Sequence, residues 1–237
     1  MTVMLSPEEW SALTLSFRVG VCAVAASLPP AILVAYALAR WTTSRNWLPR
    51  ATRLALQLVV DLPLVLPPVV TGYLLLLCLV PGGPIGLLLK RVCGVQILFT
   101  WWAAAIASAV VSFPLLVRTI RLAFQNIDPR LELAARGLGA GPIDAFFSIS
   151  LPLAYQGVIA GAVLAFARSL GEFGATIMVL GSMEGRRTIP LAIYSLTNRP
   201  GGLEQCWRLV LISVLLACFA LAASEWLERR QYHRELA

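Results

Sequence analysis

Five long apolar runs constrain the fold of this chain more than any other feature. They cover residues 11–39, 54–80, 98–122, 153–180 and 207–227. A helix needs about 20 apolar residues to cross a bilayer, and each run is at least that long. Of the 237 residues, 59% are hydrophobic and only 13% are charged, which is far from the composition of a soluble domain. The sequence therefore predicts an all-α membrane protein: a polytopic bundle of about five spanning helices, forming a single domain over residues 1–237.

The basic residues between these runs predict the orientation of the chain in the membrane. One side carries eleven: Arg40, Arg45, Arg50, Arg53, Arg118, Arg121, Arg130, Arg136, Arg229, Arg230 and Arg234. The other side carries six: Lys90, Arg91, Arg186, Arg187, Arg199 and Arg208. Cytoplasmic loops are enriched in Lys and Arg, so we expect the N-terminus outside and the C-terminus in the cytoplasm. The residues before the first run are acidic and lack Lys and Arg, which argues against a cleaved signal peptide.

The segment 128–152, between the third and fourth runs, is long and patterned for a connection between membrane helices. Asp128 can cap a first short helix that opens with Pro129. Three glycines then provide a break, and Pro142 opens a second short helix that runs through Ile149. The pattern predicts a helix–turn–helix elbow on the cytoplasmic side. It is either a docking element for another protein or an amphipathic element that lies on the membrane surface.

Prolines are expected to break three of the spanning helices, because proline removes a backbone donor and clashes with the preceding turn. Pro29 and Pro30 fall in the first run and Pro114 in the third, while the second run holds Pro63, Pro67 and Pro68. In a membrane, the backbone groups that such a break frees need protein or water nearby. The breaks therefore either face a cavity or are kinks in a packed bundle.

Two charged residues fall inside the fourth run. Arg168 and Glu172 are four positions apart, so they share one face of a helix. A charge at this depth costs about 3 kcal/mol on insertion scales and rarely faces lipid. Arg168 either lines a transport pathway and attracts an anion, or forms a structural ion pair that fixes the helix in the bundle. After this run, the apolar stretch 188–196 is too short to span, and forms either an external interfacial helix or a re-entrant segment.

The residues that enzymes and metal sites need are scarce. The chain has one His and five Cys, without a C-x-x-C pair, so no zinc-ligand cluster is expected. There is no Ser-His-Asp set and no phosphate-binding G-x-x-x-x-G-K-[ST] loop. The net charge of +7 comes from loop arginines that act as orientation signals rather than from a basic stripe for nucleic acid. Catalysis, a bound metal and nucleic-acid binding are therefore not predicted. A disulfide between Cys93 and Cys206 is a remaining possibility.

The elbow resembles the signature loop of ABC importer permeases. The family pattern is Glu-Ala-Ala, three residues, Gly, nine residues, Ile, one residue and Leu-Pro. The matching positions are Ala134, Ala135, Gly139, Ile149, Leu151 and Pro152, with every spacing intact. The chain departs from the pattern at the acidic position, where Leu133 stands and the acid comes one residue earlier, at Glu132. With Glu132, these residues are the candidate ATPase-coupling loop.

Further motifs resemble the oxyanion branch of this family, which carries molybdate, tungstate and sulfate. They are the segments 62–73, 112–118 and 166–176. The compact length and the residues Arg187-Thr188-Ile189-Pro190 resemble molybdate permeases most closely. Within these motifs, the candidate residues of the translocation pathway are Arg168, Glu172, Thr176, Pro67 and Pro68. The resemblance covers essentially the whole chain.

The resemblance implies a type I ABC importer permease fold in a bacterial cytoplasmic membrane. It also implies an assembly: two copies of the chain form the pathway, two cytoplasmic ATPase subunits dock on the elbows, and an extracytoplasmic binding protein delivers the anion. ATP would be bound by the partner subunit and no cofactor by this chain. The alternatives are a sulfate or tungstate importer, or an ion-coupled secondary transporter that takes up its substrate without ATP. A non-transporting membrane scaffold would not explain the matched loop.

Overall fold

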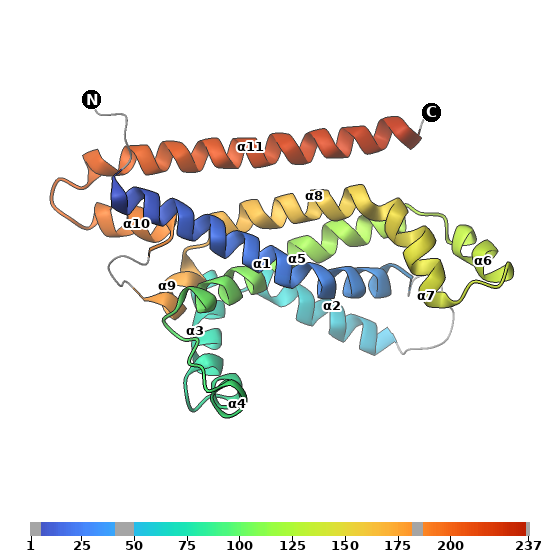
Figure 1. The fold of residues 1–237 in the computed structure, drawn as a ribbon, viewed down its shortest axis with the longest axis horizontal. Coiled ribbons are helices and arrows are strands. Elements are labelled where there is room, and N and C mark those ends of the chain that lie inside the picture. Colours follow the sequence, from blue (N-terminus) through green and yellow to red (C-terminus); the bar gives the residue numbers. More distant parts are fainter. Residues whose placement is uncertain (1–5, 41–49, 182–186, 236–237) are drawn as a thin grey trace. The chain divides into compact units, whose positions relative to one another are not determined.

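The computed structural model describes residues 6–40, 50–181 and 187–235, and every regular element within these ranges is helical (Figure 1). The helices, in chain order, are α1 (Pro7–Arg40), α2 (Arg50–Val65), α3 (Pro68–Leu79), α4 (Pro84–Cys93), α5 (Trp101–Gln125), α6 (Pro129–Gly137), α7 (Pro142–Ala145), the π-helical turn η1 (Phe146–Ser150), α8 (Leu151–Leu170), α9 (Gly174–Leu180), α10 (Ile189–Thr197) and α11 (Leu203–Glu235). The prediction of an all-α chain is confirmed.

Four continuous helical segments are long and apolar enough to cross a membrane. They are Pro7–Arg40, Trp101–Gln125, Pro142–Leu170 and Leu203–Trp226. A fifth candidate is the pair Ala51–Val65 and Pro68–Leu79, which passes the same test together but is bent at a short break. The expected count of about five spans is met if this bent pair crosses the membrane as one span.

The prolines act differently from the prediction at several positions. Only Pro67 and Pro68 coincide with a break, between α2 and α3. Helix α1 continues through Pro29 and Pro30, and α2 through Pro63, so the interruptions expected at these three prolines are wrong. Helix α5 continues through Pro114, where a kink was expected. A proline in a long membrane helix removes only one of many backbone bonds, and neighbouring groups can satisfy the freed carbonyl.

The fourth predicted span also needs correction. The run 153–180 is not one helix: α8 ends at Leu170, and the short helix α9 begins at Gly174. At the other end, α7, η1 and α8 follow one another without a gap, so the second elbow helix is continuous with the membrane span rather than separate from it. Helix α4 was not predicted. Gly83 precedes its N-terminal Pro84, and Gly94 ends it in a left-handed conformation with φ +65°.

The chain forms two compact units. Unit 1 comprises Met1–Ala26, Pro63–Ser112 and Phe166–Phe219, and unit 2 comprises Ser27–Leu62, Phe113–Ala165 and Ala220–Ala237. Helices α1, α2, α5, α8 and α11 contribute residues to both. Because the boundaries fall inside these helices, the units are not separate stretches of chain. The single domain over residues 1–237 stays a prediction.

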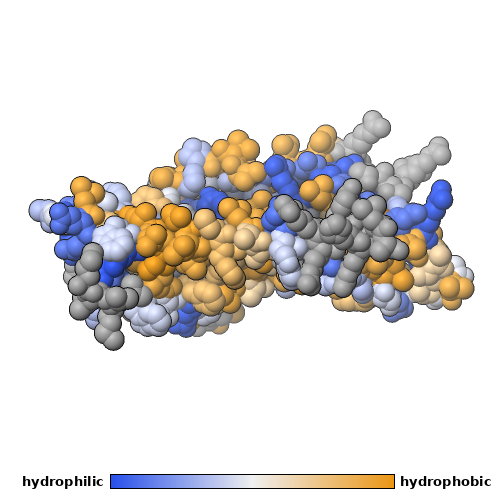
Figure 2. Space-filling view, turned by 90° about the horizontal axis from the view of Figure 1, so that it is seen from above, coloured by the Kyte–Doolittle hydropathy of each residue, from blue (hydrophilic) through white to orange (hydrophobic). Residues whose placement is uncertain are grey.

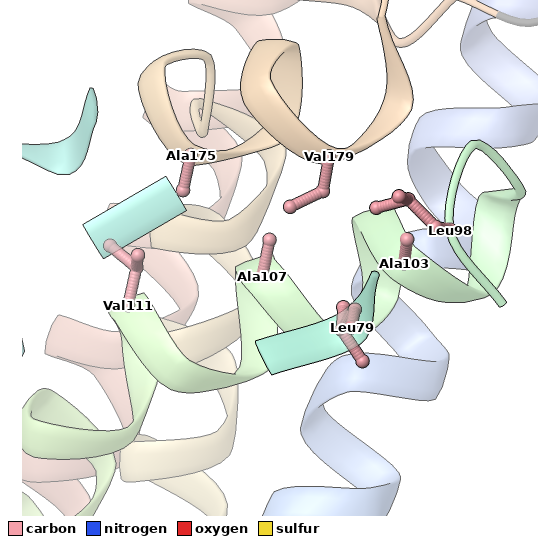
Figure 3. Packing of buried hydrophobic residues seen from close by; sticks show 7 residues of the cluster. All are labelled: Leu79, Leu98, Ala103, Ala107, Val111, Ala175 and Val179. Atoms are coloured by element: carbon pink, nitrogen blue, oxygen red, sulfur yellow. The ribbon is translucent and has the colours of Figure 1, made fainter. Parts of the chain in front are cut away.

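The core of unit 1 is built from small and medium apolar residues. Figure 3 shows seven of them, from α3, α5, α9 and the segment before α5: Leu79, Leu98, Ala103, Ala107, Val111, Ala175 and Val179. Small residues let helix backbones approach closely where lipid, rather than water, is the competing solvent. The approach of α3 to α9 is the closest example. A Cβ at Gly72 would lie 2.6 Å from the Cα of Ala175.

Many large apolar side chains are exposed, as expected of a surface that meets lipid or other membrane helices. Hydrophobic residues appear over wide areas of the face in Figure 2. The exposed large apolar residues of the chain include Leu58, Val59 and Val65 on α2 and Phe219 on α11. In a soluble monomer, apolar patches of this extent would be unusual. Of the two cysteines of the possible disulfide, Cys206 is a buried free thiol, and the side chain of Cys93 lies outside the described residues.

Candidate functional site

The first helix of the elbow begins after Asp128, as its sequence predicts. The carboxylate of Asp128 accepts a hydrogen bond of 2.9 Å from the backbone N–H of Arg130, which caps α6. Pro129 occupies the first turn of the helix, where a missing N–H costs nothing. Helix α6 ends in a turn in which the N–H of Leu138 bonds the carbonyl of Ala134. These contacts fix both ends of the first elbow helix.

Gly139 allows the chain to reverse after α6. Its φ is +99°, a conformation that residues with a side chain rarely adopt. A Cβ at this position would meet nothing within 4 Å, so backbone conformation rather than space requires glycine here. The next helix starts after Gly141, whose N–H donates to the carboxylate of Asp144 at 3.2 Å. The glycine of the family pattern is therefore the pivot of the elbow.

Glu132 is the most highly connected side chain of the elbow. Its Oε1 accepts hydrogen bonds from Nη2 and Nε of Arg40, at 2.6 and 2.9 Å, and from the hydroxyl of Ser150. Its Oε2 accepts a bond of 3.2 Å from the hydroxyl of Tyr36. Arg40 also donates to the carbonyl of Ile127 at 3.2 Å. The acid that departs from the family position therefore ties the elbow to the end of α1 and to η1.

Aromatic packing supports this anchor. The ring of Tyr36 lies edge-on to Phe124, at 5.4 Å between centroids, and to Phe146, at 4.8 Å. Edge-to-face pairs of this kind add about 0.5–1.5 kcal/mol each beyond their buried area. Phe124 and Phe146 are buried. The last turn of α5, the end of α1 and the start of η1 are thus held together within unit 2.

The other side of the elbow is exposed and partly apolar. Leu138 is 91% exposed, Ile143 70% and Leu133 63%. Ala134 and Gly139 are also exposed, Ala135 is half-buried, and none of them has a side chain that would keep a partner at a distance. Of the remaining pattern residues, Ile149 lies in η1, and Leu151 and Pro152 begin α8. The elbow thus presents an accessible surface on an anchored base.

The candidate pathway residues lie in unit 1, where Glu172 occupies the break between α8 and α9. One carboxylate oxygen pairs with Nη1 of Arg168 at 2.9 Å, and the other accepts a bond of 2.8 Å from the N–H of Ala175. The side chain of Glu172 is 2% exposed, whereas that of Arg168 is 35% exposed. The predicted pair is formed, but Glu172 holds the start of α9 instead of lying on the same helix as Arg168.

The proline break between α2 and α3 meets this region. A Cβ on Gly174 would lie 2.8 Å from the Cβ of Pro68 and 3.1 Å from the N of Val69, so the two breaks pack directly on each other. Thr176 is fully buried in α9, and its hydroxyl has no hydrogen-bond partner among the described residues. Pro67 precedes α3 in an extended conformation. The structure therefore brings Pro68 next to α9, and Arg168 next to Glu172.

The sequence did not single out the partners of Glu132. Tyr36 and Arg40 are four residues apart on α1, and Arg40 was read only as an orientation signal. The spacing of an aromatic and a basic residue on one helix face, at the cytoplasmic end of a span, is the only local sign of their role. Asp61 was also missed. It lies inside α2 and pairs with Arg118 at 2.9 Å.

An anchored elbow between membrane spans is what the resemblance to ABC importer permeases implies. Comparison with known families agrees. The model of the binding-protein-dependent transport system inner membrane component matches residues 16–232. The chain belongs to this family, and it is therefore a permease subunit of an inner membrane rather than an enzyme.

Two similar relatives lie within one part of this family and are named as molybdenum transport permeases. The molybdenum transport system permease protein ModB of Escherichia coli K12 is 49% identical over 228 residues, which cover 96% of each chain. A putative molybdenum transport system permease protein of Bacillus subtilis is 40% identical over 185 residues, covering 75% of this chain and 82% of that one. Among solved structures, a chain of a bacterial alginate ABC transporter matches with a TM-score of 0.71 and 19% identity, over 97% of this chain and 81% of that one. The fold is that of a type I ABC importer permease.

Proposed function

We propose that this chain forms the membrane pathway of an ATP-driven importer that carries molybdate into the cytoplasm. The observation that carries the proposal is the similarity, along almost the whole chain, to permeases whose names state molybdenum transport. A relationship over almost the full length of both chains is a stronger guide to the substrate than one motif. The inward direction follows from the similarity to binding-protein-dependent systems.

The elbow is where we propose that the ATPase subunits dock, one on each copy of the chain. Several of its exposed residues are small or apolar, among them Ala134, Leu138 and Ile143, which allows a partner to approach closely and bury apolar surface there. The Glu132–Arg40 pair then has a mechanical role, because it joins the docking surface to the end of α1. A movement of the ATPase would reach two spans at once: α1 through this pair, and α8 through η1.

The remaining partners are a second copy of the chain and an extracytoplasmic binding protein. The exposed apolar faces of the spanning helices suit packing against a second copy or against membrane lipid. One solved structure with this fold is a transporter in complex with its periplasmic protein, which supports a partner of that kind here. ATP belongs to the ATPase partners, and we assign no cofactor to this chain.

Arg168, Glu172, Thr176, Pro67 and Pro68 are the residues that we place at the pathway. A deep arginine without a partner would hold a dianion too tightly to release it. The Glu172 carboxylate lowers that attraction, while about a third of the Arg168 side chain stays accessible. The two breaks that pack at Pro68 and Gly174 provide a place where helices can bend, because their backbone bonds are already interrupted.

The experiment is uptake into liposomes that hold this chain with its ATPase and binding protein. Molybdate is supplied outside, ATP is enclosed, and sulfate or tungstate is added in competition. We expect ATP-dependent molybdate uptake that excess sulfate barely reduces. Uptake of sulfate in preference to molybdate would change the assigned substrate to sulfate and leave the ATP-driven mechanism unchanged. Uptake that persists without ATP would favour an ion-coupled transporter and overturn the proposal.

A further inference from the structure

Three arginines and one aspartate gather in unit 2. Asp61 of α2 accepts a hydrogen bond of 2.9 Å from Nε of Arg118 of α5. Arg121 lies one turn further along α5, on the same face as Arg118. The charged groups that act on Arg121 are Arg53, Asp61 and Arg118. The group therefore carries three positive charges and one negative charge.

Arg121 lacks an acceptor. Its Nε is buried and has no hydrogen-bond partner among the described residues, and no ion pair joins it to a described carboxylate. A buried donor without an acceptor is costly, and most such groups in folded proteins have a partner. The guanidinium of Arg118 contacts Asp61 through Nε, and its side chain is 52% exposed. Both guanidinium groups can therefore receive an oxygen ligand that the described residues do not supply.

The position of the cluster suits a site at the inner end of the pathway. The charge bias of the loops assigns this end of α5 to the cytoplasmic side. Arg121 is four residues before the end of α5 at Gln125, and the elbow begins at Asp128. Arginines inside membrane spans usually face a protein interior or a water-filled path rather than lipid. The cluster thus lies near the cytoplasmic end of α5, a few residues before the elbow.

We propose that Arg118 and Arg121, supported by Arg53, form an oxyanion-binding site at the cytoplasmic end of the pathway, with Asp61 as its competing counter-ion. A guanidinium presents two parallel N–H groups that match two oxygens of a tetrahedral oxyanion. When the site is empty, Asp61 holds Arg118. An arriving anion competes for Arg118, and the return of Arg118 to Asp61 favours release. The inference rests on the proposed function and adds to it a site of exit.

Phosphate groups of lipids share this chemistry, so the test separates the two sources. The complete assembly, without its binding protein, is placed in nanodiscs of phosphatidylcholine alone or with phosphatidylglycerol, and equilibrium binding of radioactive molybdate is measured. A free-oxyanion site binds molybdate in both lipids. A lipid-headgroup site instead retains phosphatidylglycerol, which the Arg121 variant loses, and shows no variant-dependent molybdate binding. That result would overturn the proposal.

Two variants are expected to change molybdate affinity in opposite directions. Arg121→Gln removes a charge-assisted contact and should weaken molybdate binding about tenfold. Asp61→Asn removes the competitor and should tighten binding several-fold, while slowing turnover in the full importer. Arg91→Gln is the matched control, because Arg91 is an exposed arginine of α4 and lies outside the cluster. It loses the same charge and should bind as the wild type does.

Folding and the proposed function are checked separately. If Arg121→Gln does not assemble, Arg121→Lys replaces it, because lysine keeps the positive charge but lacks the paired N–H groups of the guanidinium. The direction in which Asp61→Asn changes molybdate binding then decides whether the exit site exists. Wild-type import of molybdate with unchanged binding in both variants would overturn the exit site alone. Import by the wild type without measurable equilibrium binding of molybdate would also overturn the exit site alone. A wild type that imports none of the oxyanions would instead contradict the proposed function.

Discussion

Arg40 and Glu132 are 92 positions apart in the chain, and their side chains meet at 2.6 Å. Each side chain is 15% exposed, and the same carboxylate also accepts bonds from Tyr36 and Ser150. Because one carboxylate serves α1, the elbow and η1, these three elements are constrained to move together. The elbow is therefore part of the bundle mechanically, and not a flexible loop that happens to contact a partner.

The first prediction concerns this network. Glu132→Ala should lower the stability of the assembled importer by about 2 kcal/mol, since it leaves the guanidinium of Arg40 and two hydroxyl groups without their acceptor. Molybdate uptake should fall more than ATP hydrolysis, because the docking surface is kept while its link to α1 is lost. Thermal unfolding and the ratio of uptake to hydrolysis measure the two effects. Glu204→Gln, at an exposed acid of α11, is the control. Equal losses of uptake and hydrolysis would argue against a coupling role.

The second prediction concerns the pivot of the elbow. Gly139→Ala should cost about 1–2 kcal/mol, because an L-residue is strained at positive φ even though the space is open. Uptake should fall several-fold in proteoliposomes with equal amounts of assembled protein. Gly137→Ala is the matched control, since Gly137 ends α6 without a positive φ and its added Cβ would also meet nothing within 4 Å. Similar uptake in the two variants would remove the special role of Gly139.

The third prediction concerns the contact between the two breaks. Gly174→Ala should destabilise the protein by about 1–3 kcal/mol, because its Cβ would overlap Pro68 and force a shift of α3 or α9. Uptake should decrease with it. Gly171→Ala, three residues earlier, has its nearest neighbour at 3.9 Å and should be tolerated. The measurements are the midpoint of thermal unfolding and the rate of uptake. A harmless Gly174→Ala would show that α3 and α9 are not packed as described.

The fourth prediction separates the two roles of Arg168. Arg168→Gln alone leaves Glu172 buried without its ion-pair partner, which should cost about 3 kcal/mol. The double variant Arg168→Met with Glu172→Gln removes both charges and should recover most of that stability. If Arg168 attracts the anion, the stable double variant still needs a higher molybdate concentration for half-maximal uptake. If that concentration equals the wild-type value, the pair is structural only.

Sequence reasoning identifies the spans and the elbow because both have local signals. The length of an apolar run and the order of caps, glycines and prolines around the elbow suffice. The break at Glu172 was not recognised, because Arg168 and Glu172 fit an ion pair along one continuous helix equally well. The helix stops there because the buried carboxylate of Glu172 bonds both Arg168 and the N–H of Ala175. Pro29 and Pro30 mislead for the opposite reason, because α1 tolerates them.

The candidate site residues also divide into those that have a local sequence signal and those that depend on the fold. Ala134, Ala135 and Gly139 were found because the pattern keeps fixed spacing within one segment. Tyr36 and Arg40 were missed because their partner, Glu132, is nearly a hundred residues away and only the fold brings them together. Asp61 was missed for the same reason, since its meaning depends on Arg118 of another helix.

The central claim is that ATP hydrolysis by ATPase subunits docked on the elbows drives molybdate import. The most direct test is to measure ATP hydrolysis and molybdate uptake in the same proteoliposomes. Uptake and hydrolysis are followed together, with loaded binding protein outside and either ATP or a non-hydrolysable analogue inside. We predict that molybdate accumulates in fixed proportion to the ATP hydrolysed, and that the analogue stops sustained uptake. Accumulation that continues with the analogue, or hydrolysis that never moves molybdate in an intact assembly, would contradict this account.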